Sequence, residues 1–405
     1  MVVKLSLSVQ ICLPDRLGNR LKIFMPQLIL LLAFLVSAVL TAFIIPKIIL
    51  ISYRKKLFDY FDERKVHEGI VPRLGGVAFT PVITITLALM LGLLTLVKPV
   101  GFCVSLTVYG VHMALGLSAL LVLYMEGIAD DLIGVGYKAK FLVQIICAAM
   151  IICTGIWLND LHGLMGLYGL SPWVGIPLTV LLLVFIIDAI NLIDGIDGLA
   201  SGLSMIALFF LGCLFGYCGE WAYAVFAFAA LGTLASFFVY NVFGSVEAGH
   251  KIFMGDSGSQ TIGLILGLLA VRFCMYDNDD IDGMPCNPIL VVFSLLMVPC
   301  FDVIRVMIGR IQHHRNPFMP DKTHIHHKFL ALGMSHRMAM VSILSVSSFF
   351  ILFNLSLAQV INVNVIVLVD VVLWSLMHIW LSYVIRKRKG HGNERLLGDR
   401  DDEEL

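Results

Sequence analysis

The chain has 405 residues, of which 59% are hydrophobic and only 14% are charged. Soluble globular proteins carry about 25% charged residues, so this composition excludes a soluble protein and indicates an integral membrane protein. The 28 basic and 28 acidic residues cancel, and this balance gives no reason to expect a nucleic acid as partner. Most of the nine cysteines lie within apolar runs and lack a metal-binding spacing, so they are interpreted as buried thiols.

Apolar stretches of the length that a membrane-spanning helix needs, roughly 17–25 residues, recur along the whole chain. We therefore predict an all-α, polytopic fold with about eleven transmembrane helices. These helices are expected near residues 27–50, 75–97, 104–125, 139–157, 172–189, 199–217, 221–241, 257–276, 288–310, 338–359 and 362–384. No intervening segment is long enough for a separate soluble domain, so residues 25–385 form one transmembrane domain and 386–405 a charged tail.

Basic residues indicate on which side of the membrane each loop lies, because cytoplasmic loops carry an excess of Lys and Arg. The loop after the first predicted span, residues 51–74, contains six of them, and the tail contains the basic run 386–389. On the opposite side, residues 158–171 contain none. We therefore expect the C-terminus in the cytoplasm and the N-terminus outside.

The N-terminal segment contradicts this orientation, because residues 1–24 carry four basic residues on the side expected to be outside. A normal first span follows Met25 directly. We therefore interpret residues 1–24 as an extension upstream of a true start at Met25. A signal peptide is less consistent with the sequence, because no clear small-residue cleavage site precedes Met25.

The stretch 188–202 follows a purely apolar run but contains polar side chains that lipid would exclude. Four of them recur at intervals of three residues: Asp188, Asn191, Asp194 and Asp197. A charged side chain in the bilayer centre costs at least about 2.5–3.5 kcal/mol. Gly195 and Gly198 predict that the helix breaks there. Helix capping explains one or two of the four polar residues, so the stretch is predicted to form one wall of a polar site.

A second cluster follows the third predicted span. Asp130 and Asp131 are adjacent carboxylates, which repel each other unless a cation neutralises them. Lys138 and Lys140 begin the next helix, where a lysine is unfavourable against the helix dipole unless it faces a phosphate. A solvated loop also explains an acidic pair, so the interpretation as a site depends on the other clusters.

Two further clusters precede apolar spans. Asp256 lies in a Gly-Asp-Ser-Gly-Ser turn, where free backbone N–H groups and an acid can hold a metal and phosphates. The same turn is also a plausible helix cap. Arg73 lies in a Pro-Arg-Leu-Gly-Gly sequence, whose glycines allow a close approach to the backbone and whose charge either attracts anions or only sets the topology.

The last cluster contains three histidines, His324, His326 and His327, next to Lys322 and Lys328 in a loop expected to be cytoplasmic. A structural zinc site favours cysteines or a tetrahedral ligand set, and no cysteine is near in sequence. The histidines therefore indicate binding of an anion or a sugar phosphate more than binding of zinc.

In order and spelling, these five clusters resemble the polyprenyl-phosphate N-acetylhexosamine-1-phosphate transferase superfamily over about residues 27–340. The segments that carry the resemblance are Lys65-Val-His-Glu with Pro72-Arg-Leu-Gly-Gly, Asp130-Asp131 with Lys138-Ala-Lys140, Asn191-Leu-Ile-Asp-Gly-Ile-Asp-Gly, Phe253-Met-Gly-Asp-Ser-Gly-Ser and Pro320-Asp-Lys-Thr-His-Ile-His-His. Within the superfamily the sequence looks like the bacterial undecaprenyl-phosphate N-acetylglucosamine-1-phosphate transferases. The paralogue that uses UDP-MurNAc-pentapeptide usually has three consecutive histidines, which Ile325 interrupts here.

The resemblance implies transfer of a HexNAc-1-phosphate, foremost GlcNAc-1-phosphate, from a UDP-sugar to undecaprenyl phosphate, with release of UMP. It implies a role in starting cell-surface glycans such as O-antigen and lipopolysaccharide, in the bacterial inner membrane, with the active site at the cytoplasmic face. A homodimer is one assembly that it allows. Such a transfer accumulates negative charge, so it needs Mg²⁺, or Mn²⁺ in its place, together with lysines and backbone donors.

The resemblance also implies roles for single residues. Asp256 is the leading Mg²⁺ ligand and Asn191 the second. Asp130 and Asp131 would orient or deprotonate the lipid phosphate, and either Lys138 or Lys140 would hold a phosphate. The expected substrate-binding residues are Arg73 and Asp194, with Asp197, Asn241 and Phe253 at uracil, and His324, His326 and His327 at the diphosphate or the sugar.

Two departures from the family pattern and several alternatives stay open. The family commonly has Asn at the position of Asp188, which places an anion near the metal or opposite a lysine. The spacing from Asn241 to Asp256 exceeds that of the pentapeptide-using branch, which weakens the uracil assignment. Other donors are UDP-GalNAc, a deoxy-amino sugar or UDP-MurNAc-pentapeptide. An ion-coupled transporter would place such groups near the membrane midplane between repeats, and no repeat is visible.

Overall fold

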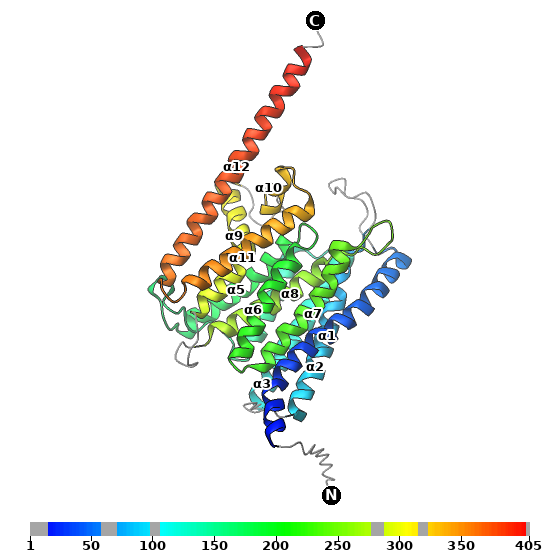
Figure 1. Ribbon diagram of the computed structural model, residues 1–405, viewed down its shortest axis with the longest axis vertical. Helices are drawn as coiled ribbons and strands as arrows, with labels where there is room; N and C mark the ends of the chain where they lie inside the picture. The colour runs from blue at the N-terminus through cyan, green and yellow to red at the C-terminus, as the bar shows by residue number, and fades with distance from the viewer. Residues whose placement is uncertain (1–14, 58–70, 98–105, 277–286, 315–322, 402–405) are drawn as a thin grey trace.

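The computed structural model describes residues 15–57, 71–97, 106–276, 287–314 and 323–401, without the side chains of 15–25, 97, 106–109 and 389–401. Within these ranges the chain is helical and contains no strand (Figure 1). The elements are α1 (Asp15–Lys55), η1 (Gly75–Ala78), α2 (Phe79–Val97), α3 (Leu106–Ile133), α4 (Tyr137–Ile152), η2 (Leu164–Gly166), α5 (Pro172–Ile193), α6 (Leu199–Tyr217), α7 (Trp221–Phe243), α8 (Gly255–Cys274), α9 (Pro288–Gln312), α10 (Ile325–Ala331), α11 (His336–Leu357) and α12 (Val363–Asp401).

Ten helices in the described ranges are long and apolar enough to cross a membrane, which confirms the predicted all-α, polytopic class. The remaining predicted span, 139–157, corresponds to α4. This helix has 16 residues and is shorter than predicted. Lys140 in the first turn of α4 and Asn191 in the last turn of α5 both contact Asp256. Because α4 and α5 pack against each other, the chain from 140 to 191 runs away from this end of the bundle and returns to it.

Two helix ends differ from the prediction where the polar clusters lie. The third span was expected to end at residue 125, but α3 continues to Ile133, so Asp130 and Asp131 lie in its last turns. The fifth was expected to end at 189, but α5 continues to Ile193 and includes Asn191. Apolar runs define the part of a helix in lipid, whereas the helix itself continues as long as its backbone remains hydrogen-bonded.

The central helix of the bundle is α8, which packs against α3, α5, α6 and α9. It has the lowest hydropathy of the ten candidate spans, 1.3, yet 94% of its most apolar window is buried. Small residues allow this close packing: a Cβ on Gly263 would lie 2.7 Å from the Cα of Ile187. The enclosed position of α8 places its N-terminal turn, with Asp256, at the centre of one end of the bundle.

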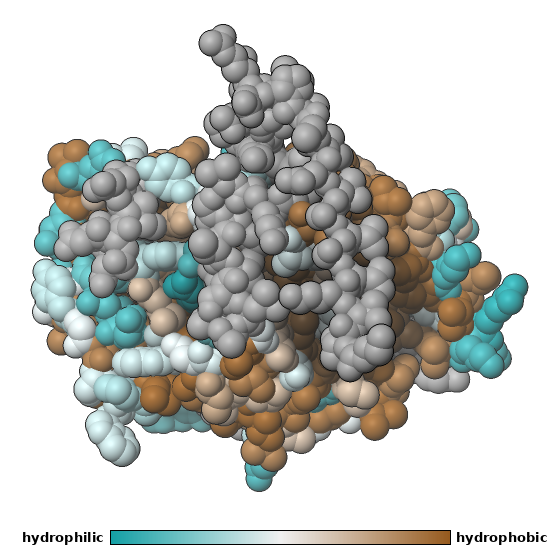
Figure 2. Space-filling view, turned by 90° about the horizontal axis from the view of Figure 1, so that it is seen from below, coloured by the Kyte–Doolittle hydropathy of each residue, from teal (hydrophilic) through white to brown (hydrophobic). Residues whose placement is uncertain are grey.

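The outer helices expose the large apolar side chains that a lipid-facing surface requires. Phe43 on α1 is 69% exposed and Leu181 on α5 is 67% exposed. In Figure 2, apolar side chains gather in the right and lower parts of the view, and hydrophilic ones in the left part. Figure 1 also shows α12 continuing beyond the end of the bundle at which α10 lies.

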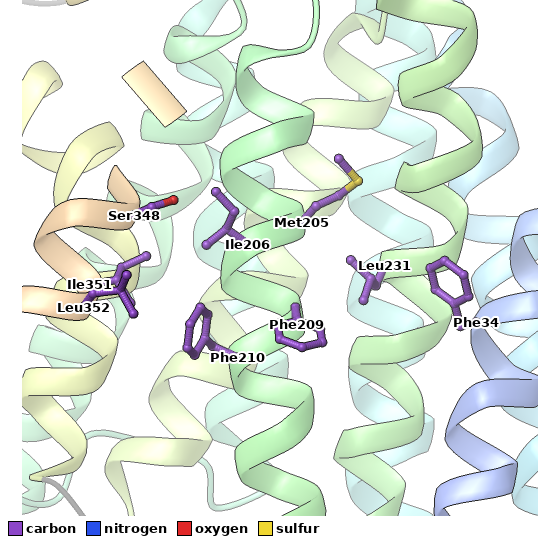
Figure 3. Close-up of a pocket in the computed structure, with 9 residues that line it drawn as sticks. All are labelled: Phe34, Met205, Ile206, Phe209, Phe210, Leu231, Ser348, Ile351 and Leu352. Atoms are coloured by element: carbon purple, nitrogen blue, oxygen red, sulfur yellow. The ribbon is translucent and has the colours of Figure 1, made fainter. Parts of the chain in front are cut away.

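An apolar groove lies between α6, α11, α7 and α1, lined by residues that include Phe34, Phe210 and Leu352 (Figure 3). Towards the N-terminus of α6, the space between α6 and α11 is closed. A Cβ on Gly198 would lie 2.4 Å from the Met340 sulfur, and one on Gly202 would lie 2.8 Å from a Leu344 methyl carbon. This helix contact separates the groove from the polar end of α6.

Candidate active site

Four helix ends meet around Asp256, at one end of the bundle. Lys140 Nζ on α4 lies 3.0 Å from Asp256 Oδ2 and also pairs with Asp130 on α3. On α5, Asn191 Nδ2 donates to Asp256 Oδ1 at 2.5 Å. We refer to Asp130, Lys140, Asn191 and Asp256 as the Asp256 cluster. Its members come from three of the sequence motifs and lie together in the fold.

Asp131 connects α3 to the start of α8. Its Oδ1 accepts a hydrogen bond from the backbone N–H of Asp256 at 2.7 Å, and its Oδ2 accepts one from Ser257 at 3.0 Å. The first N–H groups of a helix lack partners within the helix and carry partial positive charge. Asp131 therefore caps α8 from a neighbouring helix. Both oxygens of Asp131 are engaged in these bonds. The other member of the predicted acidic pair, Asp130, lies beside Lys140.

The glycine pair after Arg73 holds η1 directly against the start of α8. The N–H groups of Gly75 and Gly76 donate to the carbonyl oxygens of Phe253 and Met254 at 3.0 and 2.8 Å. A Cβ on Gly76 would lie 2.0 Å from the backbone nitrogen of Gly258. The sequence predicted a close approach to these glycines, and the approaching group is the backbone of α8.

Asp188 lies one turn before Asn191 on α5 and contacts α4. Its Oδ1 accepts a hydrogen bond from Gln144 Nε2 at 2.9 Å, and the same nitrogen lies 3.4 Å from Gln260 Oε1. A lysine partner was one expectation for Asp188, and the structure gives it a glutamine in that place. Asp188, Gln144 and Gln260 form a buried polar layer behind the Asp256 cluster.

The predicted break between α5 and α6 is present, and Gly198 adopts a φ of +78° at the start of α6. Asp194 lies in this break, where its carboxyl group interacts electrostatically with Asp256. Burial, together with the negative charges of Asp256, Asp197 and Asp131, raises the pKa of Asp194 to about 7. Asp194 is therefore an acid that changes its charge near neutral pH.

The three residues expected at uracil lie near the start of α6, in two different environments. Asp197 forms an ion pair of 2.6 Å with Lys251, whose Nζ lies 6.0 Å from the centroid of the half-buried Phe253 ring. Asn241 is 5% exposed. Its Oδ1 accepts a hydrogen bond from the backbone N–H of Gly198, and its Nδ2 donates one to the carbonyl oxygen of Ile252. Asn241 therefore connects α7 to the segments that precede α6 and α8, and Asp197, Lys251 and Phe253 form the accessible part of this group.

The histidine motif lies at the start of α10, a short helix in a region where the sequence predicts a loop. Asp302, a fully buried acid on α9, accepts hydrogen bonds from His324 Nδ1 at 2.9 Å and from the backbone N–H of Ile325 at 3.0 Å. Asp302 also pairs with Arg305 at 2.7 Å. The rings of His324 and His326 are parallel, with centroids 5.8 Å apart. Asp302 thus fixes the start of α10 and the orientation of the first imidazole.

His326 connects α10 to the break after α5. Its Nε2 would lie 2.3 Å from a Cβ on Gly195, so the imidazole packs directly on the Gly195 backbone. The ring of His327, which is half-buried, lies 4.2 Å from the ring of His326. Burial and the neighbouring histidines lower the pKa of His326 to about 3. His326 therefore offers hydrogen-bonding nitrogens, without a positive charge, to any ligand beside the break.

Two other predicted residues differ in their exposure. Lys138 is exposed, in contrast to the half-buried Lys140. Arg73 is half-buried and interacts electrostatically with Asp194. The Lys65-Val-His-Glu motif and residues 315–322, which include Lys322, lie outside the described residues.

Some residues of the site were missed from the sequence: Glu126, Gln144, Lys251 and Asp302. Gln144 and Asp302 are polar side chains within predicted spans, and Glu126 directly follows the predicted span 104–125. An ionisable residue at such a position is itself a signal for a functional site. Lys251 lies two residues before Phe253, and its partner Asp197 is 54 residues away in the sequence. Asp302 in particular follows an apolar run and precedes Arg305 by three residues, a spacing that predicts contact on one helix face.

The donor atoms around Asp256 suit a hard divalent cation. The Asp256 carboxylate supplies oxygen, and Asn191 supplies an amide oxygen once its side chain is rotated. Among the described residues, no group of three or more His, Cys, Asp or Glu side chains converges closely enough to hold a metal ion. Mg²⁺ usually binds proteins through one or two carboxylates and completes its shell with water and substrate phosphates. The residues present therefore fit Mg²⁺ bound together with a phosphate ligand.

Comparison with known proteins identifies the family. Residues 113–274 match the model of glycosyl transferase family 4. The chain is 32% identical over 328 residues to a decaprenyl-phosphate N-acetylglucosaminephosphotransferase of Mycobacterium leprae (strain TN), covering 76% of this chain and 78% of the relative. It is 30% identical over 358 residues to a protein of Bacillus subtilis (strain 168) named "Probable undecaprenyl-phosphate N-acetylglucosaminyl 1-phosphate transferase", covering 88% and 89%.

A third relative, the undecaprenyl-phosphate alpha-N-acetylglucosaminyl 1-phosphate transferase of Escherichia coli (strain K12), is 27% identical over 290 residues, which are 71% of this chain and 72% of that protein. The family model ends at the last residue of α8 and so covers the Asp256 cluster, whereas the whole-chain matches extend over most of the bundle. The chain therefore belongs to glycosyl transferase family 4, in the polyprenyl-phosphate N-acetylhexosamine-1-phosphate transferase superfamily.

Proposed function

We propose that this chain transfers N-acetylglucosamine-1-phosphate from UDP-N-acetylglucosamine to undecaprenyl phosphate. The observation that supports it best is the Asp256 cluster, in which Lys140 and two acids meet at the ends of three helices. An oxygen of the lipid phosphate attacks the phosphorus that bears the sugar. The bond from this phosphorus to the bridging oxygen breaks, so UMP leaves and the undecaprenyl-diphospho-sugar remains.

Mg²⁺ is part of this proposal, with Mn²⁺ as a substitute. Asp256 and the amide oxygen of Asn191 would hold the ion, which when bound neutralises charge on the donor diphosphate. Lys140 would pair with phosphate oxygens, and Asp130 would orient the lipid phosphate or accept its proton. Asp131 keeps the first turn of α8 in place through its two backbone hydrogen bonds.

The proposed location is the bacterial inner membrane, with the Asp256 end of the bundle at the cytoplasmic face. Two observations support this orientation. The polar ends of α3, α4, α5 and α8 meet at Asp256, and α10 contacts the break after α5. The sequence places the basic loops and the basic tail on the same side of the membrane as these ends. The product would then be the first lipid-linked intermediate of a cell-surface glycan.

The decisive experiment supplies the purified full-length protein with undecaprenyl phosphate, Mg²⁺ and one UDP-sugar at a time, and measures released UMP. We expect UDP-N-acetylglucosamine to give the highest kcat/KM among UDP-N-acetylglucosamine, UDP-N-acetylgalactosamine, a UDP-linked deoxy-amino sugar and UDP-MurNAc-pentapeptide. Asp256→Asn serves as the inactive control, because it removes a charge that would bind the metal. Absence of UMP with every donor would refute the transferase reaction, and preference for another donor would refute only the sugar assignment.

A further inference from the structure

Glu126 is a buried acid that the proposed reaction does not use. It lies on α3, one helical turn before Asp130, and is 9% exposed. Both of its carboxyl oxygens are buried and make no hydrogen bond of ordinary geometry. The side chain of Gln260 interacts with Glu126, and its Nε2 is also buried without a hydrogen bond of ordinary geometry. A buried polar group without a partner is costly and calls for an explanation.

The charges around Glu126 belong to the Asp256 cluster. Glu126 interacts electrostatically with Lys140, Asp130 and Asp256. The i to i+4 spacing on α3 places the side chains of Glu126 and Asp130 on the same face, with their Cβ atoms about 5–6 Å apart. A lysine that pairs with Asp130 is therefore near Glu126 as well.

In the structure, both oxygens of Asp256 are occupied. Lys140 Nζ lies at Oδ2 and Asn191 Nδ2 donates to Oδ1. A divalent cation coordinated by this carboxylate, as the proposed function requires, would meet the ammonium group of Lys140 at the same acid. Two cations held by the same carboxylate group repel each other strongly. Binding of the ion therefore requires Lys140 to leave Asp256.

Glu126 differs from the other acids of α3 and α5 near Lys140 in that both of its oxygens are buried without a hydrogen bond of ordinary geometry. Asp131 uses both oxygens to cap α8, and Asp188 accepts from Gln144. We propose that Glu126 is a positioning residue that receives the ammonium of Lys140 when Asp256 binds a divalent cation. Lys140 would keep Asp130 as one partner and exchange Asp256 for Glu126. This inference rests on the proposed function only through the divalent ion at Asp256.

The test measures binding of Mn²⁺ alone to the detergent-purified full-length protein, by the electron paramagnetic resonance signal of free Mn²⁺. In Glu126→Gln, Lys140 has no acid to take the place of Asp256. It therefore competes with Mn²⁺ for Asp256, and we expect the Kd for Mn²⁺ to rise at least fivefold. Asp188→Asn is the matched control, since it removes a neighbouring buried carboxylate that already has an amide partner. Its Kd should stay within twofold of wild type.

A double-mutant cycle separates this role from a merely structural one. In a Lys140→Met background the competing cation is absent, so Glu126→Gln should no longer change the Kd. An unchanged Kd in Glu126→Gln, or an equal rise in the Lys140→Met background, would overturn the proposal. If wild type binds no Mn²⁺ without a phosphate ligand, this proposal fails, whereas the metal part of the proposed function, in which substrate phosphates complete the shell, is unaffected. Wild-type binding with an unaffected Glu126→Gln removes this inference alone.

A structure of the wild-type protein with Mn²⁺ provides a test that needs no variant. We expect Lys140 Nζ within about 3.2 Å of a Glu126 oxygen, with the ion at Asp256. Lys140 still bonded to Asp256 Oδ2 beside the bound ion would overturn the exchange.

Discussion

Two lysines in the first turn of α4 differ in their surroundings, although the sequence treats them alike. Lys140 pairs with Asp130 and Asp256, whereas Lys138 is exposed. We expect Lys140→Met to lower UMP release by about 10²-fold or more, the scale at which loss of one preorganised electrostatic contact affects catalysis. Lys138→Met is the matched control on the same turn and should keep more than about half of the activity.

The measurement is UMP release with both substrates saturating, together with the thermal midpoint of each variant in detergent. Equal losses in the two lysine variants would contradict the assignment of the phosphate contact to Lys140. A large drop in midpoint for Lys140→Met alone would attribute its loss to folding.

Asp194 gives a prediction about pH. Its pKa is raised to about 7 from a value of 3.8 for an unperturbed aspartate. The folded chain therefore binds this proton more tightly than the unfolded chain, and stability falls as pH rises from about 4 to 7. We expect Asp194→Asn to remove this fall in the thermal midpoint and to remove one ionisation near pH 7 from the profile of kcat/KM. A profile and midpoint curve identical to wild type would refute the assignment.

At this scale, residue types indicated the site but could not indicate the partners. Asp130 and Asp131 look equivalent in the sequence, and only the fold shows that Asp131 caps a helix 125 residues further along the chain. Asp188 was interpreted through charge, yet its partner is the neutral Gln144. Such partners depend on helix packing between distant segments, which local patterns do not contain.

At the scale of elements, α10 depends on α12 as well as on α9. Lys328 Nζ donates to Ser382 Oγ at 3.0 Å and lies 3.4 Å from the carbonyl oxygen of His378. Arg388 on α12 donates to the carbonyl oxygen of Leu332, just after α10. Burial lowers the pKa of Lys328 to about 8. The C-terminal helix therefore holds the short helix that carries His326.

We expect Lys328→Met to lower kcat/KM for the UDP-sugar about tenfold, mainly through a higher KM, because a looser α10 misplaces His326. Lys328→Arg should restore most of the loss, since it can still donate to Ser382. Ser382→Ala removes one acceptor and should have a smaller effect. Steady-state kinetics with varied donor checks this, and an unchanged donor KM in Lys328→Met would show that α12 does not position the motif.

At the scale of the whole molecule, the contacts at Asp256 imply that the helices in the described ranges cross the membrane an odd number of times. The path from α4 to α5 leaves this end of the bundle and returns to it, so α4 counts as a crossing beside the ten longer helices. The start of α1 and the end of α12 then lie on opposite sides, as Figure 1 places them. Because cytoplasmic loops are rich in Lys and Arg, the C-terminus should be inside.

We therefore expect a C-terminal green fluorescent protein fusion to be fluorescent and a C-terminal alkaline phosphatase fusion to be inactive. The same reporters fused after residue 166, in the turn at η2, should give the reverse result. A fluorescent fusion at both positions would contradict the orientation and would move the Asp256 cluster to the other face.

Much of this overall architecture could be predicted, because lipid imposes a minimum length and an apolar composition on each span. The ends of α3 and α5 could not, since Asp130 and Asn191 are polar and terminate an apolar pattern before the helix itself ends. The short α10 was missed for a related reason: its seven residues are too few for a periodic pattern.

The enclosed position of α8 also has a consequence for biogenesis. Its hydropathy is the lowest of the ten candidate spans, and its neighbours α3, α5 and α6 all precede it in the chain. A helix that partitions weakly into lipid enters a membrane more readily when earlier helices already offer it a protein surface. The ribosome therefore delivers Asp256 after α3, α4 and α5, whose side chains contact it, and the Asp256 cluster would be completed only when α8 has joined them. Substitutions that weaken the α5–α8 contact, for example at Gly263, should then reduce the yield of inserted protein before they affect catalysis.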